Sequence, residues 1–377
     1  MAGIYLHIPF CKKRCIYCDF YSSTQSDLRE RYVEALCSEL EQRIHYLNNE
    51  PVTTLYFGGG TPSQLTIGQL QRIFDCLSRL INLQELEEVT LEANPDDLTP
   101  AYVEGLSTLP INRLSMGIQS FDDRMLQLLN RRHTALQAIK AVARCREAGF
   151  QNLSIDLMYG LPGQDEEGWA RDLRQAVALN VEHISAYHLS IEEGTPLHRL
   201  WAAHRLNEAD EELSVRLFEM LTTTLQQAGY EQYEISNFCL PGRHSRHNSS
   251  YWHGIPYLGC GASAHSFYRT SREWNIASIE HYIEGITNGQ RAYEQESLDM
   301  NTRYNETVMT ALRTREGLSL SLLSRQFDNS YYNYCLRMAR PHLEAGLMEI
   351  SNDCLRLTHK GIFVSDAILT DLMSIAD

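Results

Sequence analysis

The sequence has 377 residues, including ten cysteines, and its 33 basic and 48 acidic residues give a formal net charge of -15 at pH 7. This length allows one large domain with a smaller one, and the acidic balance argues against broad nucleic-acid binding. We find neither a signal peptide nor an apolar run long enough to span a bilayer. We therefore expect a cytoplasmic protein whose thiols stay reduced.

In chain order, short β-branched apolar runs alternate with longer amphipathic stretches. A helical pattern over residues 28–47 follows the first run, and further along Thr134 can cap a helix that Gly149 ends. Six successive βα units imply a parallel sheet, so we predict an α/β fold with an incomplete (β/α)6 barrel. Its strands are predicted at residues 4–8, 53–57, 89–92, 113–117, 153–157 and 183–189.

The pattern changes from about residue 302. Helices are predicted at residues 304–312, 318–327 and 331–344, then a hairpin at 347–357 that turns at Asn352-Asp353, and a last helix from Thr358. This order is typical of a winged-helix-like unit, which the acidic charge makes an unlikely DNA reader. We interpret it as a lid or docking surface. The proposed division is a core at 1–230, a connecting segment at 231–300 and a C-terminal domain at 301–377.

Three cysteines, Cys11, Cys15 and Cys18, form a CxxxCxxC motif directly after the first predicted strand. A [4Fe-4S] cluster normally takes four thiolates, so three leave one iron open to a small molecule. A zinc site usually needs a second pair of ligands, and none follows nearby. A redox or purely structural role is the remaining alternative. The spacing favours the cluster.

Polar residues and glycines lie where the predicted strands end, which is where a parallel barrel keeps its site. Gly58-Gly59-Gly60-Thr61-Pro62 follows the second strand and can bring backbone N–H groups close to a ligand. Ordinary capping or solvated positions would be the alternative interpretation. The polar side chains at the later strand ends are Glu92, Gln119, Arg131 and Asp156.

Residues 5–10, Tyr-Leu-His-Ile-Pro-Phe, together with the cysteine motif, resemble the start of a radical SAM protein. Residues 91–95, 113–121 and 156–163 are similar to successive motifs of the oxygen-independent coproporphyrinogen III oxidase group within that superfamily. The resemblance implies that the cysteines hold the cluster and that S-adenosylmethionine (SAM) chelates the open iron and is cleaved by an electron from it. The SAM-binding residues it implies are Tyr5, Tyr17, Gly59, Gly60, Thr61, Glu92, Gln119, Arg131 and Asp156.

Residues 247–252, His-Asn-Ser-Ser-Tyr-Trp, form an HNxxYW pattern. A histidine beside aromatic rings suits a porphyrin, but it equally suits a polar loop pinned by two aromatic side chains. The pattern resembles the HemW family of heme chaperones. That resemblance implies heme contacts at His247, Asn248, Tyr251 and Trp252, with His265 as a second candidate ligand.

Two departures from the oxidase favour the chaperone. The oxidase has a further cysteine two residues after the triad, where this chain has Phe20, and an N-terminal extension over its substrate, whereas this chain enters its first strand almost at Met1. A radical on a primary carbon needs shielding from water. We therefore expect a chaperone with a cluster and SAM that passes heme to apo-hemoproteins, such as respiratory subunits at the inner membrane. Coproporphyrinogen III decarboxylation and radical chemistry on another substrate are the alternatives, and a homodimer stays open.

Overall fold

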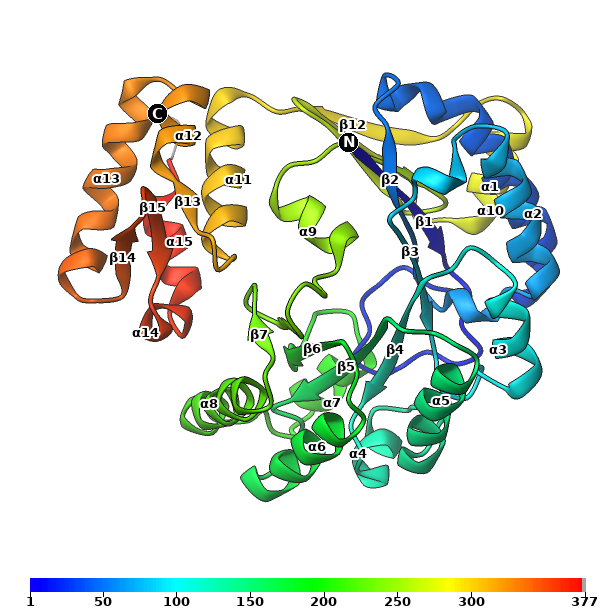
Figure 1. Cartoon of the computed structure of the whole chain (residues 1–377), viewed down its shortest axis with the longest axis horizontal. Coiled ribbons are helices and arrows are strands. Elements are labelled where there is room, and N and C mark those ends of the chain that lie inside the picture. The colour runs from blue at the N-terminus through cyan, green and yellow to red at the C-terminus, as the bar shows by residue number, and fades with distance from the viewer. Residues whose placement is uncertain (375–377) are drawn as a thin grey trace.

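The computed structural model describes residues 1–374 and is organised around a curved sheet with helices on its outer face (Figure 1). The sheet has 12 strands in the order β12-β11-β10-β9-β1-β2-β3-β4-β5-β6-β8-β7. Its strands are β1 Ala2–Ile8, β2 Val52–Gly59, β3 Glu88–Ala93, β4 Arg113–Gln119, β5 Leu153–Tyr159, β6 His183–His188, β7 Glu231–Gln232, β8 Asn237–Cys239, β9 Tyr257–Cys260, β10 His265–Tyr268, β11 Ser271–Asn275 and β12 Tyr293–Ser297.

The first eight helices are α1 Arg29–Arg43, α2 Ile67–Ser78, α3 Pro100–Ser107, α4 Asp123–Leu128, α5 Ala135–Glu147, α6 Glu166–Ala178, α7 Pro196–Ala202 and α8 Glu211–Gln227. The later ones are α9 Arg246–Trp252, α10 Ile279–Thr287, α11 Met300–Leu312, α12 Leu320–Gln326, α13 Asn329–Glu344, α14 His359–Ile362 and α15 Ser365–Leu372. No helix within residues 1–374 has the length and apolar character needed to cross a bilayer.

The six predicted strands are confirmed as β1 to β6, and each pairs in parallel with the next. Alternate residues of each strand face the two sides of the sheet. In β1, Ile4, Leu6 and Ile8 are buried against the helices, whereas Tyr5 and His7 face the hollow of the barrel. The outer face supplies the hydrophobic core, and the inner face is left for polar side chains.

Local signals explain several boundaries. Thr134 accepts the Gln137 N–H and Gln137 reaches back to the Thr134 N–H, which is the capping box that begins α5. Gly149 then takes a φ of +97°, a left-handed conformation that glycine adopts without strain. The predicted cap and stop are therefore both confirmed.

The segment 231–300 extends the sheet at both edges, which the sequence analysis did not predict. Strand β9 pairs in parallel with β1, and β10 to β12 continue from it in antiparallel pairs. At the opposite edge, β8 and β7 pair in antiparallel fashion beyond β6. The barrel wall is thus longer than six strands.

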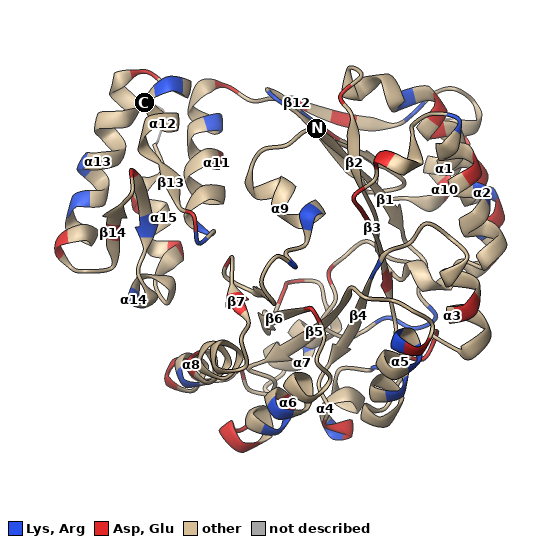
Figure 2. Cartoon of the chain, viewed as in Figure 1, with Lys and Arg blue, Asp and Glu red and all other residues tan. Residues whose placement is uncertain are grey.

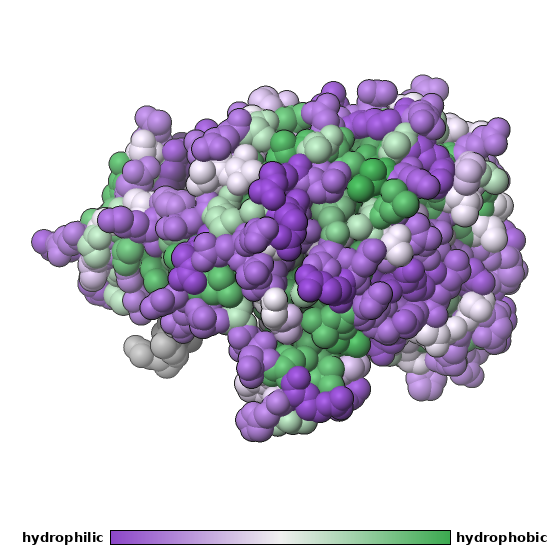
Figure 3. All heavy atoms as spheres, turned by 90° about the horizontal axis from the view of Figure 1, so that it is seen from below, coloured by the Kyte–Doolittle hydropathy of each residue, from purple (hydrophilic) through white to green (hydrophobic). Residues whose placement is uncertain are grey.

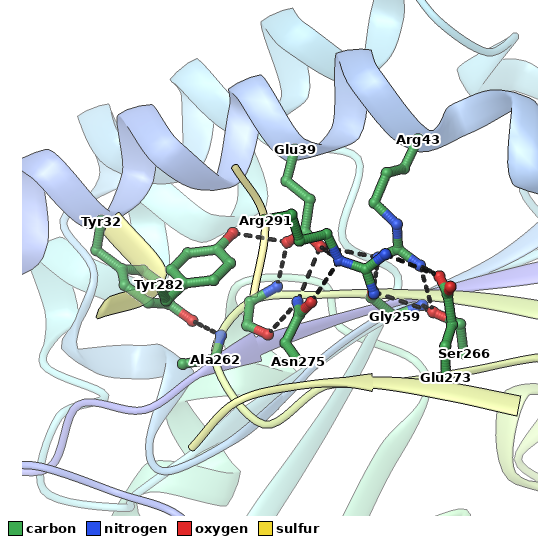
Figure 4. A network of polar contacts seen from close by, with 11 residues as sticks. Tyr32, Glu39, Arg43, Gly259, Ala262, Ser266, Glu273, Asn275, Tyr282 and Arg291 are labelled. Atoms are coloured by element: carbon green, nitrogen blue, oxygen red, sulfur yellow. Dashed lines mark hydrogen bonds and ion pairs between the residues drawn. The ribbon is translucent and has the colours of Figure 1, made fainter. Parts of the chain in front are cut away.

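A buried ionic network ties this extension to α1 (Figure 4). The Glu39 carboxylate, which is fully buried, accepts hydrogen bonds from Arg43 at 2.8 Å and from the Asn275 side-chain amide at 2.8 Å. The Tyr282 hydroxyl donates to its second oxygen at 2.7 Å, and Arg291 lies 3.5 Å from the first. Buried carboxylates require such partners, so the network fixes where the extension lies.

Residues 300–372 form a winged-helix-like unit with its own hydrophobic cluster and a three-stranded sheet, β13 Leu318–Ser319, β15 Cys354–Leu357 and β14 Met348–Ser351. The hairpin turns at Asn352 and Asp353, both with positive φ, as predicted. The helix predicted at 318–327 begins instead at Leu320. Ser319 caps it by accepting the Leu322 N–H, and residues 318–319 pair with β15.

The C-terminal unit contacts the barrel at several places, among them the Phe363 ring on Phe218 of α8 at a centroid distance of 5.4 Å. Thr314 forms a β-bridge with Glu234, supported by a hydrogen bond from the Arg315 N–H to the Tyr233 carbonyl at 3.0 Å. Elsewhere, Arg272 of β11 pairs with Glu306 of α11 at 2.7 Å. Charged residues of both signs line the outer helices (Figure 2), and on the face in Figure 3 hydrophobic residues surface in separate patches among hydrophilic ones.

Candidate cluster and cofactor site

The three cysteines lie on the loop between β1 and α1, at the carboxyl edge of the parallel strands. The loop folds back on itself, because Cys11 donates its N–H to the Ser23 carbonyl at 2.9 Å and Ser23 donates to Pro9 at 2.7 Å. Its far side is tied to the segment after α4, where the Asn130 amide donates to the Arg14 carbonyl at 2.7 Å. All three thiols are free and partly exposed.

The thiols fit a cluster by their number and chemistry. Burial is the main cause that raises the pKa of Cys11, and it raises the pKa of Cys18 to about 11, with the neighbouring cysteines adding to the effect. Bound iron would supply the positive charge that keeps such thiolates ionised. Within residues 1–374 no three Cys, His, Asp or Glu side chains are arranged to hold a single metal ion. A cubic cluster takes each thiolate at a different iron, so its ligands need not converge on one point.

Arg131 connects this loop to the strand ends. Its guanidinium lies 3.3 Å from the Cys15 sulfur and 2.5 Å from the Asn94 side-chain oxygen, and it also donates to the Gly117 carbonyl. The preceding Asn130 has a φ of +63°, a left-handed turn that Asn tolerates better than most residues. Arg131 therefore places a fixed positive charge beside the Cys15 thiol.

The acidic residues line the inner face of the barrel beside aromatic rings. The Tyr56 hydroxyl donates to Glu92 at 2.7 Å, and the Tyr5 ring stacks on Tyr56 with a centroid distance of 6.1 Å. Burial raises the pKa of Glu92 to about 7 and that of Asp156 to about 6. A cationic ligand would stabilise both ionised carboxylates, so the pair suits the ammonium or sulfonium of SAM.

The glycines at the end of β2 allow a close approach to the end of β1. Gly59 has a φ of +108°, and a Cβ there would lie 2.6 Å from the His7 imidazole. A Cβ at Gly60 would lie 2.7 Å from the Pro9 backbone. The Thr61 hydroxyl then lies 3.3 Å from the Cys11 sulfur, which brings the glycine-rich turn and the cysteine loop together.

Gln119 and Tyr17 are placed by different means. Gln119 is buried at a β-bulge that ends β4, with a φ of +72° that is strained for a residue with a side chain. Tyr17 packs on the small cluster that includes Leu129 and Leu161, and burial raises the pKa of its hydroxyl. The structure therefore brings Arg131 against the cysteine loop, which itself contains Tyr17, with Glu92 and Asp156 further along the inner face of the sheet.

Sequence reasoning missed the buried carboxylate of Asp97, to which both loops are anchored. Lys12 of the cysteine loop donates to it at 2.9 Å, Ser63 of the turn after β2 donates at 2.9 Å, and Arg132 lies 3.1 Å away. The Asp96-Asp97 pair, separated from the third strand by Asn94 and Pro95, was the available signal. Asp97 therefore holds the cysteine loop and the turn after β2 together.

The HNxxYW residues form α9, which packs against β2 inside the barrel. Glu88 accepts the N–H groups of Arg246 and His247, each at 2.9 Å, at the start of this helix. The His247 ring is only 1% exposed, and its two nitrogens lie 2.9 Å from the hydroxyls of Thr54 and Tyr251. Burial lowers the pKa of His247 to about 3, so the ring is neutral.

The other predicted heme residues are less enclosed. Asn248 lies in the first turn of α9, and its N–H donates at 3.3 Å to the hydroxyl of Ser245, which caps the helix. Trp252 is partly exposed, although its indole nitrogen is buried without a hydrogen-bond partner. His265 is exposed and stacks on Trp274. The four HNxxYW residues therefore share one short helix, and the heme contacts assigned to them stay a prediction.

Comparison with known proteins agrees with this geometry. Residues 5–176 match the model of the radical SAM superfamily and residues 298–364 match that of the HemN C-terminal domain. The heme chaperone HemW of Bacillus subtilis is 33% identical over 98% of this chain and 98% of its own length. HemW of Mycobacterium tuberculosis is 34% identical over 98% and 94% of the two chains. The chain belongs to the HemW family of radical SAM proteins. The family resemblance seen in the sequence is thereby confirmed.

A mitochondrial radical S-adenosyl methionine domain-containing protein 1 from Bos taurus is 31% identical over 99% of this chain and 87% of its own length. Among solved structures, coproporphyrinogen III oxidase (HemN) from Escherichia coli superimposes with a TM-score of 0.85 at 24% identity, covering 99% of this chain and 90% of that one. The latter similarity confirms the predicted fold class.

Proposed function

We propose that this protein is a cytoplasmic heme chaperone that holds a [4Fe-4S] cluster with SAM, binds heme, and transfers it to apo-hemoproteins, including membrane respiratory subunits. The observation that carries the proposal is the end-to-end similarity to proteins described as heme chaperones. The order of motifs, from the cysteine loop to the HNxxYW helix and the C-terminal unit, supports it.

The residues have distinct tasks in this proposal. Cys11, Cys15 and Cys18 would hold three irons, and the bound cluster with SAM supplies one-electron chemistry at the fourth. Arg131 keeps a positive charge beside Cys15, which favours its thiolate. Glu92, whose pKa is raised to about 7 by burial, exchanges its proton for the positive charge of SAM.

Oxidative decarboxylation of coproporphyrinogen III is the second candidate, and the shared fold with HemN favours it. The side chain at position 20, where the oxidase resemblance calls for a cysteine, is a phenylalanine that is 65% exposed. This position contributes no thiol to the cluster loop. The sequence of this loop therefore fits a heme chaperone better than the oxidase.

The deciding experiment reconstitutes the cluster anaerobically and splits one sample between two assays. We expect tight hemin binding in a Soret titration, delivery of that heme to an apo-hemoprotein, and no decarboxylated product from coproporphyrinogen III with SAM and a reductant. Product formation without specific hemin binding would overturn the proposal in favour of the oxidase.

A further inference from the structure

A large cavity lies between the sheet extension and the C-terminal unit, apart from the cluster loop. Its volume is about 670 Å³, within the range of about 300 to 1,000 Å³ that small-molecule sites occupy. The C-terminal end of α9 forms one wall, α11 and α12 another, and the inner face of β9 to β11 a third. The HNxxYW helix therefore contacts the barrel with its first residues and this cavity with its last.

The cavity combines aromatic walls with basic groups. Trp252, Tyr257 and Phe267 supply flat apolar surfaces. Arg303 of α11 also lines it and lies over the Phe327 ring at 6.0 Å, and no ion pair joins it to a carboxylate within residues 1–374. Arg269 lies 3.8 Å from Glu50 and over the Tyr268 ring at 5.3 Å from its centroid. Two guanidinium groups with weak or no partners suit a ligand with two carboxylates.

The cavity also holds an accessible imidazole. His253, the residue directly after the HNxxYW pattern, is 54% exposed at its side chain, and its Nδ1 lies 2.7 Å from the Ser249 carbonyl. A carbonyl only accepts, so Nδ1 carries the proton and Nε2 of the neutral ring keeps a lone pair. Glu316 lies 3.4 Å from Nε2 but is 73% exposed, which leaves it room to turn away.

We infer that heme is carried in this cavity, with His253 Nε2 as its iron ligand and with Arg303 and Arg269 pairing its propionates. The inference rests on the proposed function and makes it specific. His247 would then act as a positioning residue, because Thr54 and Tyr251 already occupy its two nitrogens and its ring is enclosed. The iron ligand is therefore assigned to His253, which follows the HNxxYW motif, and not to His247, the first residue of the motif.

The test titrates hemin and iron-free protoporphyrin IX into the full-length protein, followed by Soret absorbance and tryptophan fluorescence. We expect His253→Ala to weaken hemin binding about tenfold, the ratio that 1.4 kcal/mol represents, to alter the hemin Soret and EPR spectra, and to leave protoporphyrin IX binding unchanged. Arg303→Ala should weaken both ligands about tenfold. His281→Ala and Arg325→Ala, at exposed positions outside the cavity, are matched controls and should change neither.

Each contrary result has a separate meaning. If the wild-type protein binds no hemin, the proposed function fails and this inference fails with it. If it binds hemin but His253→Ala keeps the affinity and spectra, only the inference is overturned. Equal weakening of hemin and protoporphyrin IX by His253→Ala would refute iron ligation by this residue. His247→Gln, checked for folding by circular dichroism, should retain the iron-ligation spectrum, and its loss in a folded variant would return the ligand to His247.

Discussion

Replacing Glu92 by Gln should stabilise the protein without its cofactor and weaken its binding of SAM. Burial raises the pKa of Glu92 from its ordinary value of 4.5 to about 7. Between these pH values the folded protein keeps a proton that the unfolded chain releases, so the carboxyl group lowers the free energy of unfolding as pH rises. The loss is small near pH 4.5 and complete above about pH 7.

The size of the effect follows from the shift. One pKa unit corresponds to about 1.4 kcal/mol, so the pKa shift of Glu92 can change the free energy of unfolding by at most about 3 kcal/mol. The residue faces the hollow of the barrel, which water can reach, and an amide nitrogen could not accept the hydrogen bond that Gly59 gives to the carboxylate. We therefore expect the free energy of unfolding of Glu92→Gln at pH 8 to exceed that of the wild type by about 2 kcal/mol.

The assay is urea denaturation of the cofactor-free protein at pH 5 and pH 8, followed by circular dichroism. Glu104→Gln, an exposed substitution on α3, is the control and should change neither midpoint. SAM binding by the reconstituted protein should weaken in Glu92→Gln and strengthen in the wild type as pH rises through about 7, because the ionised carboxylate favours a cation. A Glu92→Gln variant that is less stable at pH 8, or equally stabilised at both pH values, would refute the reasoning.

Three further predictions concern contacts outside Glu92. Arg131→Gln should lose its cluster several-fold faster in air, measured by the decay of iron-sulfur absorbance, because Cys15 loses its neighbouring charge; unchanged decay would contradict this. Glu39→Ala should lower the free energy of unfolding by about 3 to 5 kcal/mol in urea denaturation, because buried cationic partners are left without their carboxylate, and a loss under 1 kcal/mol would show that water replaces it. Arg272 of β11 and Glu306 of α11 both line the cavity and form an ion pair, so Glu306→Gln, which removes the pair, should speed hemin transfer to apomyoglobin in stopped-flow measurements; unchanged or slower transfer would contradict this.

Local signals made the barrel and parts of its site predictable. The β-branched apolar runs of β1 to β6 are recognisable from their own residues. Thr134 begins a helix and Asn352 makes a turn through contacts within a few residues in the chain. The extension was not predictable in this way. Strand β9 has four residues, and its pairing with β1 joins segments about 250 residues apart.

The same distinction applies to single side chains. The sequence placed His247 beside aromatic residues, but its burial depends on Thr54, which lies 193 residues away in the chain. The role of Asp97 likewise depends on Lys12 and Arg132, which come from two other loops. Motifs indicate which side chains matter, whereas their hydrogen-bond partners follow only from the folded arrangement.

The network around Glu39 also has a consequence for how the chain folds while it is being translated. Helix α1 leaves the ribosome early, yet Asn275, Tyr282 and Arg291, which satisfy its buried carboxylate, are made more than 230 residues later. One edge of β1 also has no neighbouring strand until β9 is made at residues 257–260, and open strand edges invite pairing with other chains. The nascent barrel therefore stays incomplete for about three quarters of translation, and protection of this edge by a holdase is most valuable over that interval.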